Sequence, residues 1–124
     1  MSKKGKVVIV EDDSSILKMY QTSLQNDGYD VAGAKNGEDG VELVKKEKPD
    51  IVLLDIMMPK MDGFAVLEQL KSEESTKNIP VIMLTNLSQD EDKERSNKLG
   101  AVDYLVKSDF TPMQVSEKIK KYLR

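Results

Sequence analysis

The chain has 124 residues, of which 33% are charged and 39% are apolar, a balance typical of one soluble globular domain. Its net charge of −3 argues against a basic surface for nucleic acid, and no apolar run approaches the roughly 20 residues that span a bilayer. The absence of cysteine and histidine excludes disulfides and thiolate chemistry, together with the commonest general base and transition-metal ligand.

Five short runs rich in apolar or β-branched residues predict strands. In chain order they are Val7–Val10, Asp30–Ala34, Ile51–Leu54, Pro80–Leu84 and Val102–Val106. Several of these runs are apolar at consecutive positions, which is typical of strands buried on both faces of a parallel sheet.

Each strand is followed by a segment that predicts a helix. We expect the fourth helix to begin with a capping box between Ser88 and Glu91, and the fifth with one between Thr111 and Gln114. The apolar residues at helical spacing are Ile16, Tyr20 and Leu24 in the first helix, Val41, Leu43 and Val44 in the second, Val66, Leu67 and Leu70 in the third, and Val115, Ile119 and Leu123 in the fifth.

A strand and then a helix, repeated five times, predict an α/β fold. Such alternation builds a (βα)5 three-layer sandwich, in which right-handed crossovers place helices on both faces of a five-stranded parallel sheet. We expect residues 1–124 to form a single domain with no output domain. The charged N-terminus lacks the apolar stretch of a signal peptide, so the cytoplasm is the simplest location.

Polar side chains stand where four of the predicted strands end. They are Glu11, Asp12 and Asp13 after the first strand, Asp55 after the third, Thr85 after the fourth and Lys107 at the end of the fifth. In open α/β sheets, ligands bind at the carboxyl ends of the strands, where the strand order reverses. We therefore expect these residues to converge at one edge of the sheet.

The acids indicate a hard dication. Carboxylates a few ångströms apart repel one another, and ligation by oxygens with several retained waters suits Mg²⁺. Asp12 and Asp55 are the expected direct ligands, Glu11 is expected to act through water, and the backbone carbonyl of Met57 could complete the set. For Asp13 alone, the better interpretation is an N-cap of the first helix.

Asp55 is the central residue, because a carboxylate can act as a nucleophile and form an aspartyl phosphate. The incoming phosphoryl group needs cations and hydrogen-bond donors, which Mg²⁺, Lys107 and the Thr85 hydroxyl can supply. Taken singly, Lys107 could be an ordinary surface lysine and Thr85 part of a turn. Their combination with Asp55 favours the chemical interpretation.

Four segments and the element order together resemble one family, the response-regulator receiver domains, also called CheY-like. The matching segments are "VVIVEDD", "PDIVLLDIMMPKMDG", "VIMLT" and "GAVDYLVK". The resemblance covers essentially the whole chain and implies a flavodoxin-like sheet with strand order 2-1-3-4-5. It also implies a signalling phospho-acceptor rather than an enzyme, with Mg²⁺-dependent phosphoryl transfer to Asp55 from a partner histidine kinase or phosphotransfer protein.

The resemblance further implies a switch. Glu11 and Asp12 correspond to the family's acidic pair, and Thr85 corresponds to a hydroxyl that moves inward to bond the phosphoryl group. Tyr104 corresponds to an aromatic residue that points outward until this movement makes room for it. The fourth helix, fifth strand and fifth helix then carry the signal to an unknown downstream protein, without direct contact with nucleic acid or membrane.

Two positions near the lysine and the hydroxyl depart from the family pattern. Ser108 stands where most relatives have a proline, so the bond after Lys107 could be cis or trans. Asn86 stands where relatives usually have a small residue, and it could narrow access to Asp55.

Three apolar residues suggest how this chain differs in function. In the family that the chain resembles, the positions of Met57 and Leu87 flank the path of the water that attacks the aspartyl phosphate. Both side chains are apolar and offer this water no hydrogen bond, so we predict slow self-dephosphorylation. Val102 stands where dimerising relatives have an acid, which predicts a monomer or a weak dimer.

Three other functions fit part of the pattern. A flavodoxin-like cofactor protein would share the fold, but the acids after the first strand would repel a cofactor phosphate. A Mg²⁺-dependent carboxylate-nucleophile phosphatase would place its nucleophile after the first strand, where "EDDSS" lacks the usual Asp-x-Asp pattern. A phosphorylation-independent interaction module on the same fold would not need Asp55, Lys107 and Thr85 together.

Overall fold

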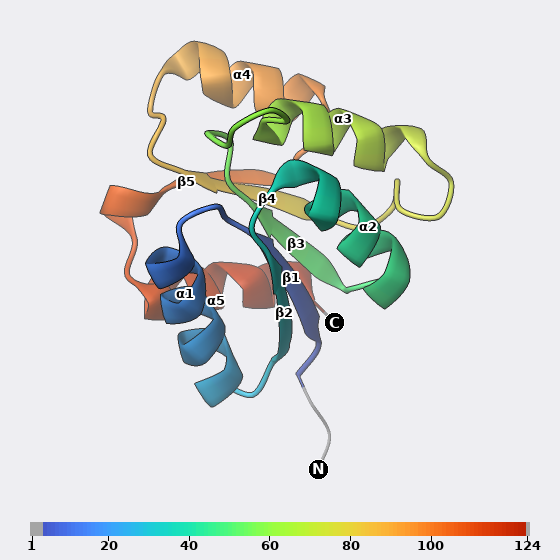
Figure 1. Ribbon diagram of the computed structural model, residues 1–124. Coiled ribbons are helices and arrows are strands. Elements are labelled where there is room, and N and C mark those ends of the chain that lie inside the picture. Colours follow the sequence, from blue (N-terminus) through green and yellow to red (C-terminus); the bar gives the residue numbers. More distant parts are fainter. Residues whose placement is uncertain (1–3, 124) are drawn as a thin grey trace.

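The computed structural model describes residues 4–123, in which five strands alternate with five α-helices (Figure 1). The strands are β1 (Lys6–Val10), β2 (Asp30–Ala34), β3 (Ile51–Leu54), β4 (Val81–Thr85) and β5 (Asp103–Val106). The helices are α1 (Ser14–Asn26), α2 (Gly37–Glu47), α3 (Gly63–Ser72), α4 (Asp90–Lys98) and α5 (Pro112–Tyr122), and a short 3₁₀ helix, η1 (Lys107–Asp109), follows β5.

The five strands form one parallel sheet in the order β2-β1-β3-β4-β5. This order confirms the predicted fold. The chain runs outward from β1 to β2 and then returns to the other side of β1 to form β3. The strand order therefore reverses between β1 and β3, which is the point where open α/β sheets bind ligands.

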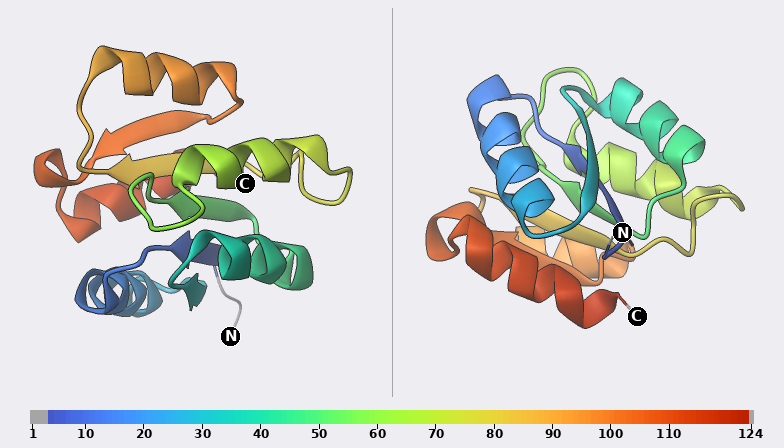
Figure 2. Two further views of the ribbon diagram at one scale, coloured as in Figure 1. Left: turned by 45° about the horizontal axis from the view of Figure 1, so that its top comes forward. Right: turned by 90° about the horizontal axis from the view of Figure 1, so that it is seen from below.

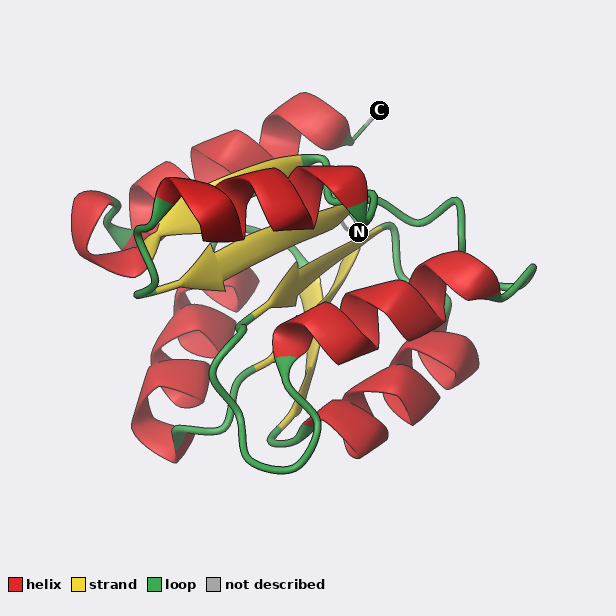
Figure 3. Cartoon of the chain, turned by 90° about the horizontal axis from the view of Figure 1, so that it is seen from above, coloured by secondary structure: helices red, strands yellow, loops and turns green. Residues whose placement is uncertain are grey.

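The sheet lies between two layers of helices. Figures 1 and 2 show α1 and α5 on one face and α2, α3 and α4 on the other, and Figure 3 shows the sheet enclosed between them. Val7 and Ile9 of β1 belong to the apolar cluster beneath α1 and α5, whereas Val8 and Val10 belong to the opposite cluster. Every residue of β3 and β4 is buried, which explains their runs of consecutive apolar residues.

Two of the expected helix starts are confirmed. The Asp13 carboxylate accepts hydrogen bonds from the backbone N–H groups of Ser15 and Ile16, so Asp13 is the N-cap of α1. Thr111 and Gln114 form the predicted reciprocal capping box at the start of α5. Both caps depend on residues no more than three positions apart, which makes them visible in the sequence.

The expected start of α4 is wrong. No capping box forms between Ser88 and Glu91, because α4 begins at Asp90 and its N-cap, Gln89, makes no side-chain hydrogen bond to the helix. The first turn contains three acids, and their charge stabilises the positive end of the helix without a side-chain cap. β4 and β5 also begin one residue later than expected, at Val81 and Asp103.

α4 differs from the other helices in how it packs. Its sequence, DEDKERSNK, contains no apolar residue, and Ser96 is its only buried side chain. The Arg95 guanidinium lies over the ring of Phe64 in α3, 4.1 Å from the ring centroid. Leu99, just after the helix, packs against the apolar cluster on this face. The helix is therefore attached by its ends and by one stacked cation.

Candidate metal and phosphoryl site

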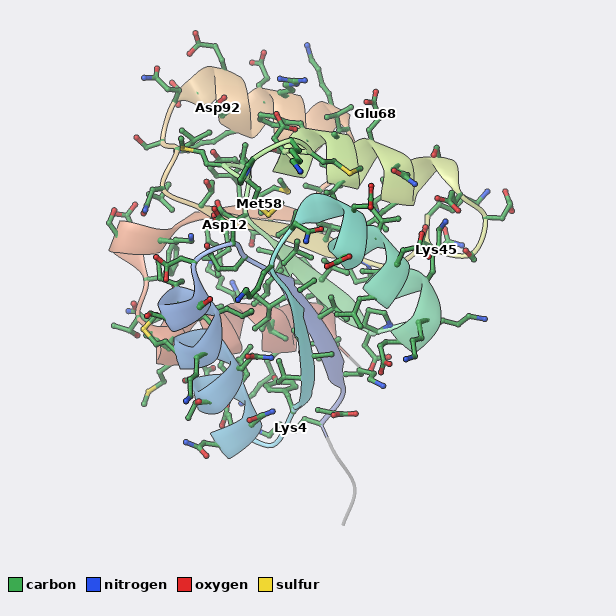
Figure 4. All side chains as sticks on the ribbon, in the orientation of Figure 1. Lys4, Asp12, Lys45, Met58, Glu68 and Asp92 are labelled. Atoms are coloured by element: carbon green, nitrogen blue, oxygen red, sulfur yellow. The ribbon has the colours of Figure 1, made fainter. Side chains whose placement is uncertain are left out.

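The predicted site residues lie where the strands end. Glu11 follows β1, Asp55 follows β3, Thr85 ends β4 and Lys107 opens η1 after β5. Glu11 and Asp55 are only 3% and 6% exposed, respectively. Asp12 is exposed, and Figure 4 shows it at the same end of the sheet as Met58 of the β3–α3 loop. The site thus combines buried acids with one acid open to solvent.

Three carboxylates form an acidic cluster at this edge. One oxygen from each of Glu11, Asp12 and Asp55 lies within 4.8 Å of the other two. Like charges at this separation repel one another unless a cation lies between them. The donor set consists of carboxylate oxygens only, with an open side toward solvent, which fits a hard cation that keeps part of its water shell. The residues present therefore fit Mg²⁺.

Lys107 joins the two buried acids. Its Nζ donates a hydrogen bond to Glu11 Oε1 and another, of 3.1 Å, to Asp55 Oδ2. The structure thus places the lysine in the site rather than on the surface. The Lys107–Ser108 peptide bond, which the sequence left open, is trans, as are the other peptide bonds of residues 4–123.

Burial and neighbouring charges shift the pKa values of Glu11 and Lys107. Burial raises the pKa of Glu11, although the hydrogen bond from Lys107 opposes this effect. Burial also favours the neutral amine of Lys107, but its hydrogen bond to Glu11 and the negative charge of Asp55 outweigh this effect, so the pKa of Lys107 is raised. Lys107 is therefore a cation at neutral pH.

Backbone groups orient both buried carboxylates. The N–H of Ile56 donates to Asp55 Oδ1 at 2.8 Å, and the N–H of Asp13 donates to Glu11 Oε2 at 3.0 Å. The N–H of Gly63, the first residue of α3, donates to the carbonyl of Ile56 at 2.8 Å. Because these donors belong to the fixed backbone, the carboxylates are held in place before any ligand binds.

Gly63 is a positioning residue that the sequence analysis missed. A Cβ atom at this position would lie 2.3 Å from the backbone oxygen of Asp55, far inside van der Waals contact. Only glycine lets α3 begin this close to Asp55. The "MDGF" segment carries a signal for it, because an N-cap acid followed by glycine is a costly choice for a helix start unless the backbone must approach closely.

Thr85 and Tyr104 are linked through one residue of the β4–α4 loop. The buried Thr85 hydroxyl accepts the N–H of Leu87 at 3.4 Å, and the Tyr104 hydroxyl donates to the carbonyl of Leu87 at 2.7 Å. The expectation that Tyr104 points outward is wrong: its ring is half-buried against the apolar cluster. The Leu87 carbonyl faces β5, so the phenol finds a hydrogen-bond acceptor on the inner side.

The two apolar residues expected to flank the site lie in different surroundings. The Met57 side chain is 60% exposed, whereas Leu87 is half-buried against the apolar cluster. Asn86 is exposed. The role of the Met57 carbonyl as a ligand and the slow loss of a phosphoryl group stay predictions.

Comparisons with known proteins agree with this architecture. The family model described as "Response regulator receiver domain" matches residues 7–120. CheY4, a chemotaxis protein of Vibrio cholerae, is 31% identical and superposes with a TM-score of 0.89 over 95% of this chain and 98% of its own. The BeF₃-activated receiver domain of RstA from Klebsiella pneumoniae is 33% identical, with a TM-score of 0.88 over 96% and 98%.

Longer relatives share the same region. A probable transcriptional regulator, ycf27, of Porphyridium aerugineum is 40% identical over 98% of this chain and 49% of its own length. The alkaline phosphatase synthesis regulator PhoP of Bacillus subtilis is 39% identical over 96% and 48%. The chain thus spans about half the length of these curated relatives. Its fold, its acidic pocket and its matched residues show that it belongs to the response regulator receiver domains, the signalling modules of two-component systems.

Proposed function

We propose that Asp55 accepts a phosphoryl group from a phosphohistidine of a partner histidine kinase or phosphotransfer protein, in a reaction that requires Mg²⁺. The arrangement of Asp55 carries this proposal, because its buried carboxylate belongs to an acidic cluster suited to a cation and also accepts a hydrogen bond from the ammonium of Lys107. Cations on two sides of the carboxylate would let it approach a phosphoryl group that it would otherwise repel.

Each residue has a distinct part in the transfer. Glu11, Asp12 and Asp55 would hold Mg²⁺, which supplies positive charge for the oxygens of the phosphoryl group. A carboxylate oxygen of Asp55 attacks phosphorus as the P–N bond of the donor breaks, and the electron pair of that bond leaves with the imidazole. Lys107 and the Thr85 hydroxyl then bond oxygens of the aspartyl phosphate.

The Thr85–Leu87–Tyr104 contacts support a path from the phosphorylated site to a signalling face formed by α4, β5 and α5. When Thr85 turns to the phosphoryl group, its hydrogen bond with the Leu87 N–H changes, and the Leu87 carbonyl that holds Tyr104 is part of the same residue. Tyr104 already occupies an inner position, so phosphorylation would increase the population of one existing arrangement rather than create it.

The same proposal covers the chain as a signalling module. Residues 1–124 act as a single receiver domain, a monomer or weak dimer in the cytoplasm, and transmit the signal to a protein target. Among the helices of residues 4–123, none combines the length and hydrophobicity that crossing a bilayer would require.

Intact-mass measurement after incubation with acetyl phosphate and Mg²⁺ tests the proposal. The wild-type protein should gain the mass of one phosphoryl group, and both Asp55→Asn and chelation of Mg²⁺ should abolish the gain. Asp62→Asn is the matched control, because Asp62 caps α3 close to the site and lies outside the acidic cluster. Phosphorylation that persists in Asp55→Asn would place the acceptor elsewhere.

A further inference from the structure

A groove separates the β3–α3 loop from α4, beside the proposed phosphorylation site. Its volume is about 450 Å³. Met57, Met58 and Pro59 form one wall, and Leu87 and Arg95 form the other. Figure 4 shows Met58 below α4, and Met58 belongs to the apolar cluster on the face of the sheet that α2, α3 and α4 cover. The groove is therefore large enough for one or two side chains of another molecule, and most of its lining is apolar.

Arg95 supplies an unpaired positive charge in this groove. None of the ion pairs formed within residues 4–123 includes Arg95. Its guanidinium is instead held over the Phe64 ring, a contact that fixes its position and leaves its N–H donors available. Asp62, the one acid at the rim, already accepts the N–H of Ala65 at 2.9 Å as the cap of α3.

We propose that this groove binds a segment of a partner protein in which an apolar side chain stands next to a carboxylate. The apolar side chain lies between Met57 and Leu87, where the flexible thioether of methionine adapts to different shapes. The carboxylate pairs with the preoriented guanidinium of Arg95, whose planar fork matches two oxygens. The ion pair with Arg95 thus favours a segment that carries a carboxylate over one with a neutral amide at the same position.

The groove also has a connection to the switch. Leu87 forms part of its wall, and the same residue bonds Thr85 through its N–H and Tyr104 through its carbonyl. A movement of Thr85 toward Asp55 would therefore move the wall of the groove. This coupling rests on the proposed function, whereas the binding of the segment does not.

The binding is tested with the capped tripeptide acetyl-Leu-Asp-Phe-amide and protein labelled with ¹³C at its methionine methyl groups. The methyl signals of Met57 and Met58 should shift on titration, while those of Met19 and Met113, which lie outside the groove, should not. Replacing the aspartate of the probe with asparagine should weaken binding about fivefold to tenfold, because the charge-assisted hydrogen bond to Arg95 is lost.

Two variants separate the groove from general electrostatics. Arg95→Gln should weaken binding of the aspartate tripeptide by the same factor of about five to ten. Lys98→Gln removes an equal charge from the same helix but outside the groove, and it should leave the affinity for the tripeptide within twofold of wild type. Equal losses in both variants, no loss in Arg95→Gln, or shifts of Met19 and Met113 as large as those of Met57 would overturn the proposal.

The coupling is measured by repeating the titration with acetyl phosphate and Mg²⁺. The dissociation constant should change at least threefold in wild-type protein and stay constant in Thr85→Ala, since the wall then no longer follows the phosphoryl group. An unchanged constant in protein shown by mass to be phosphorylated would overturn the coupling. If no phosphoryl group is gained, the proposed function fails, and the Arg95→Gln comparison still decides whether the groove binds the segment.

Discussion

At the scale of single residues, the space around the Asp55 backbone constrains the site as strongly as its charges do. Gly63, the first residue of α3, lies in close contact with the Asp55 carbonyl. Its N–H donates a hydrogen bond to the carbonyl of Ile56. The same few atoms thus position the proposed acceptor and start a helix. A side chain at residue 63 must displace one or the other.

Gly63→Ala should therefore reduce the free energy of unfolding by about 1–3 kcal/mol, the usual cost of overpacking, although alanine is the better helix former. Urea denaturation measures this loss. Gln69→Ala, at an exposed position of the same helix, should stay within about 0.5 kcal/mol of wild type. A Gly63→Ala variant as stable as wild type would mean that α3 moves away from Asp55 without cost.

Two buried serines should respond in opposite directions to the same substitution. Ser96 is 1% exposed and its hydroxyl has no hydrogen-bond partner within residues 4–123, whereas Ser116 is 2% exposed and donates to the Asp27 carboxylate. Ser96→Ala should raise the free energy of unfolding by about 1 kcal/mol, and Ser116→Ala should lower it by about 1 kcal/mol. Paired urea titrations measure the two changes; equal signs would contradict the assignment.

Tyr104 predicts a dependence of stability on alkaline pH. Burial, with the negative charges of Asp92 and Asp55, raises the pKa of Tyr104 to about 12. An unfolded tyrosine has a pKa of about 10, so the folded state holds this proton more tightly and stability should fall as pH rises from about 10 to about 12. In Tyr104→Phe this part of the decline should disappear from urea midpoints measured across that range. The variant should also lose a tyrosine that titrates near pH 12 in an ultraviolet titration.

At the scale of elements, α4 stands apart because it buries almost no apolar surface. α3 buries Phe64, Val66, Leu67 and Leu70, while α4 buries only Ser96. A helix without an apolar stripe gains little from tertiary packing, which supplies most helix stability in proteins. The helix proposed to transmit the signal is therefore stabilised least by apolar packing against the sheet.

Backbone amides of α4 should exchange with deuterium about 100-fold faster than those of α3 under native conditions, because α4 opens locally without global unfolding. Hydrogen exchange resolved by peptide or by residue gives the comparison. Equal protection of the two helices would show that the stacking of Arg95 on Phe64 anchors α4 as firmly as an apolar face.

Local and non-local features differed in how well the sequence predicted them. Consecutive apolar residues located β3 and β4, and rules that act over three residues located the caps at Asp13 and Thr111. The start of α4 was missed because a capping motif also needs the right backbone conformation, which tertiary structure sets. The inward position of Tyr104 depends on a carbonyl 17 residues away.

The convergence of the site residues was predicted for a different reason. Glu11 and Lys107 are 96 positions apart, yet both follow strands of one parallel sheet, so topology alone brings them to the same edge. The particular pairing of Lys107 with both acids could not be deduced, because it depends on side-chain reach and on local burial. The groove beside Arg95 was missed for the same reason.

At the scale of the whole molecule, the acidic cluster predicts that the folded state is stabilised by Mg²⁺. The cluster exists only when β1 and β3 are paired, so a metal bound there favours folding by about 2.7 kcal/mol at a concentration 100-fold above its dissociation constant. The melting temperature should rise by several degrees, and a chelator should reverse the rise.

Calorimetry of two variants that each lose one negative charge tests whether the rise in melting temperature comes from Mg²⁺ bound at the acidic cluster. Asp12→Asn should abolish most of the rise, and Glu68→Gln, at an exposed position of α3 (Figure 4), should preserve it. A similar rise in both variants would indicate a general effect of salt rather than a bound ion.

Lys107 directly follows β5, the edge strand on its side of the sheet, yet its ammonium reaches acids that follow β1 and β3. The side chain therefore spans the end of β4, which lies between β3 and β5. The length of its four methylene groups is needed for this contact as much as its charge is. Ornithine in its place would keep the charge and shorten the span by one carbon. Such a semisynthetic protein would distinguish a site that needs only a positive charge from one that needs a side chain long enough to connect the end of β5 to the ends of β1 and β3.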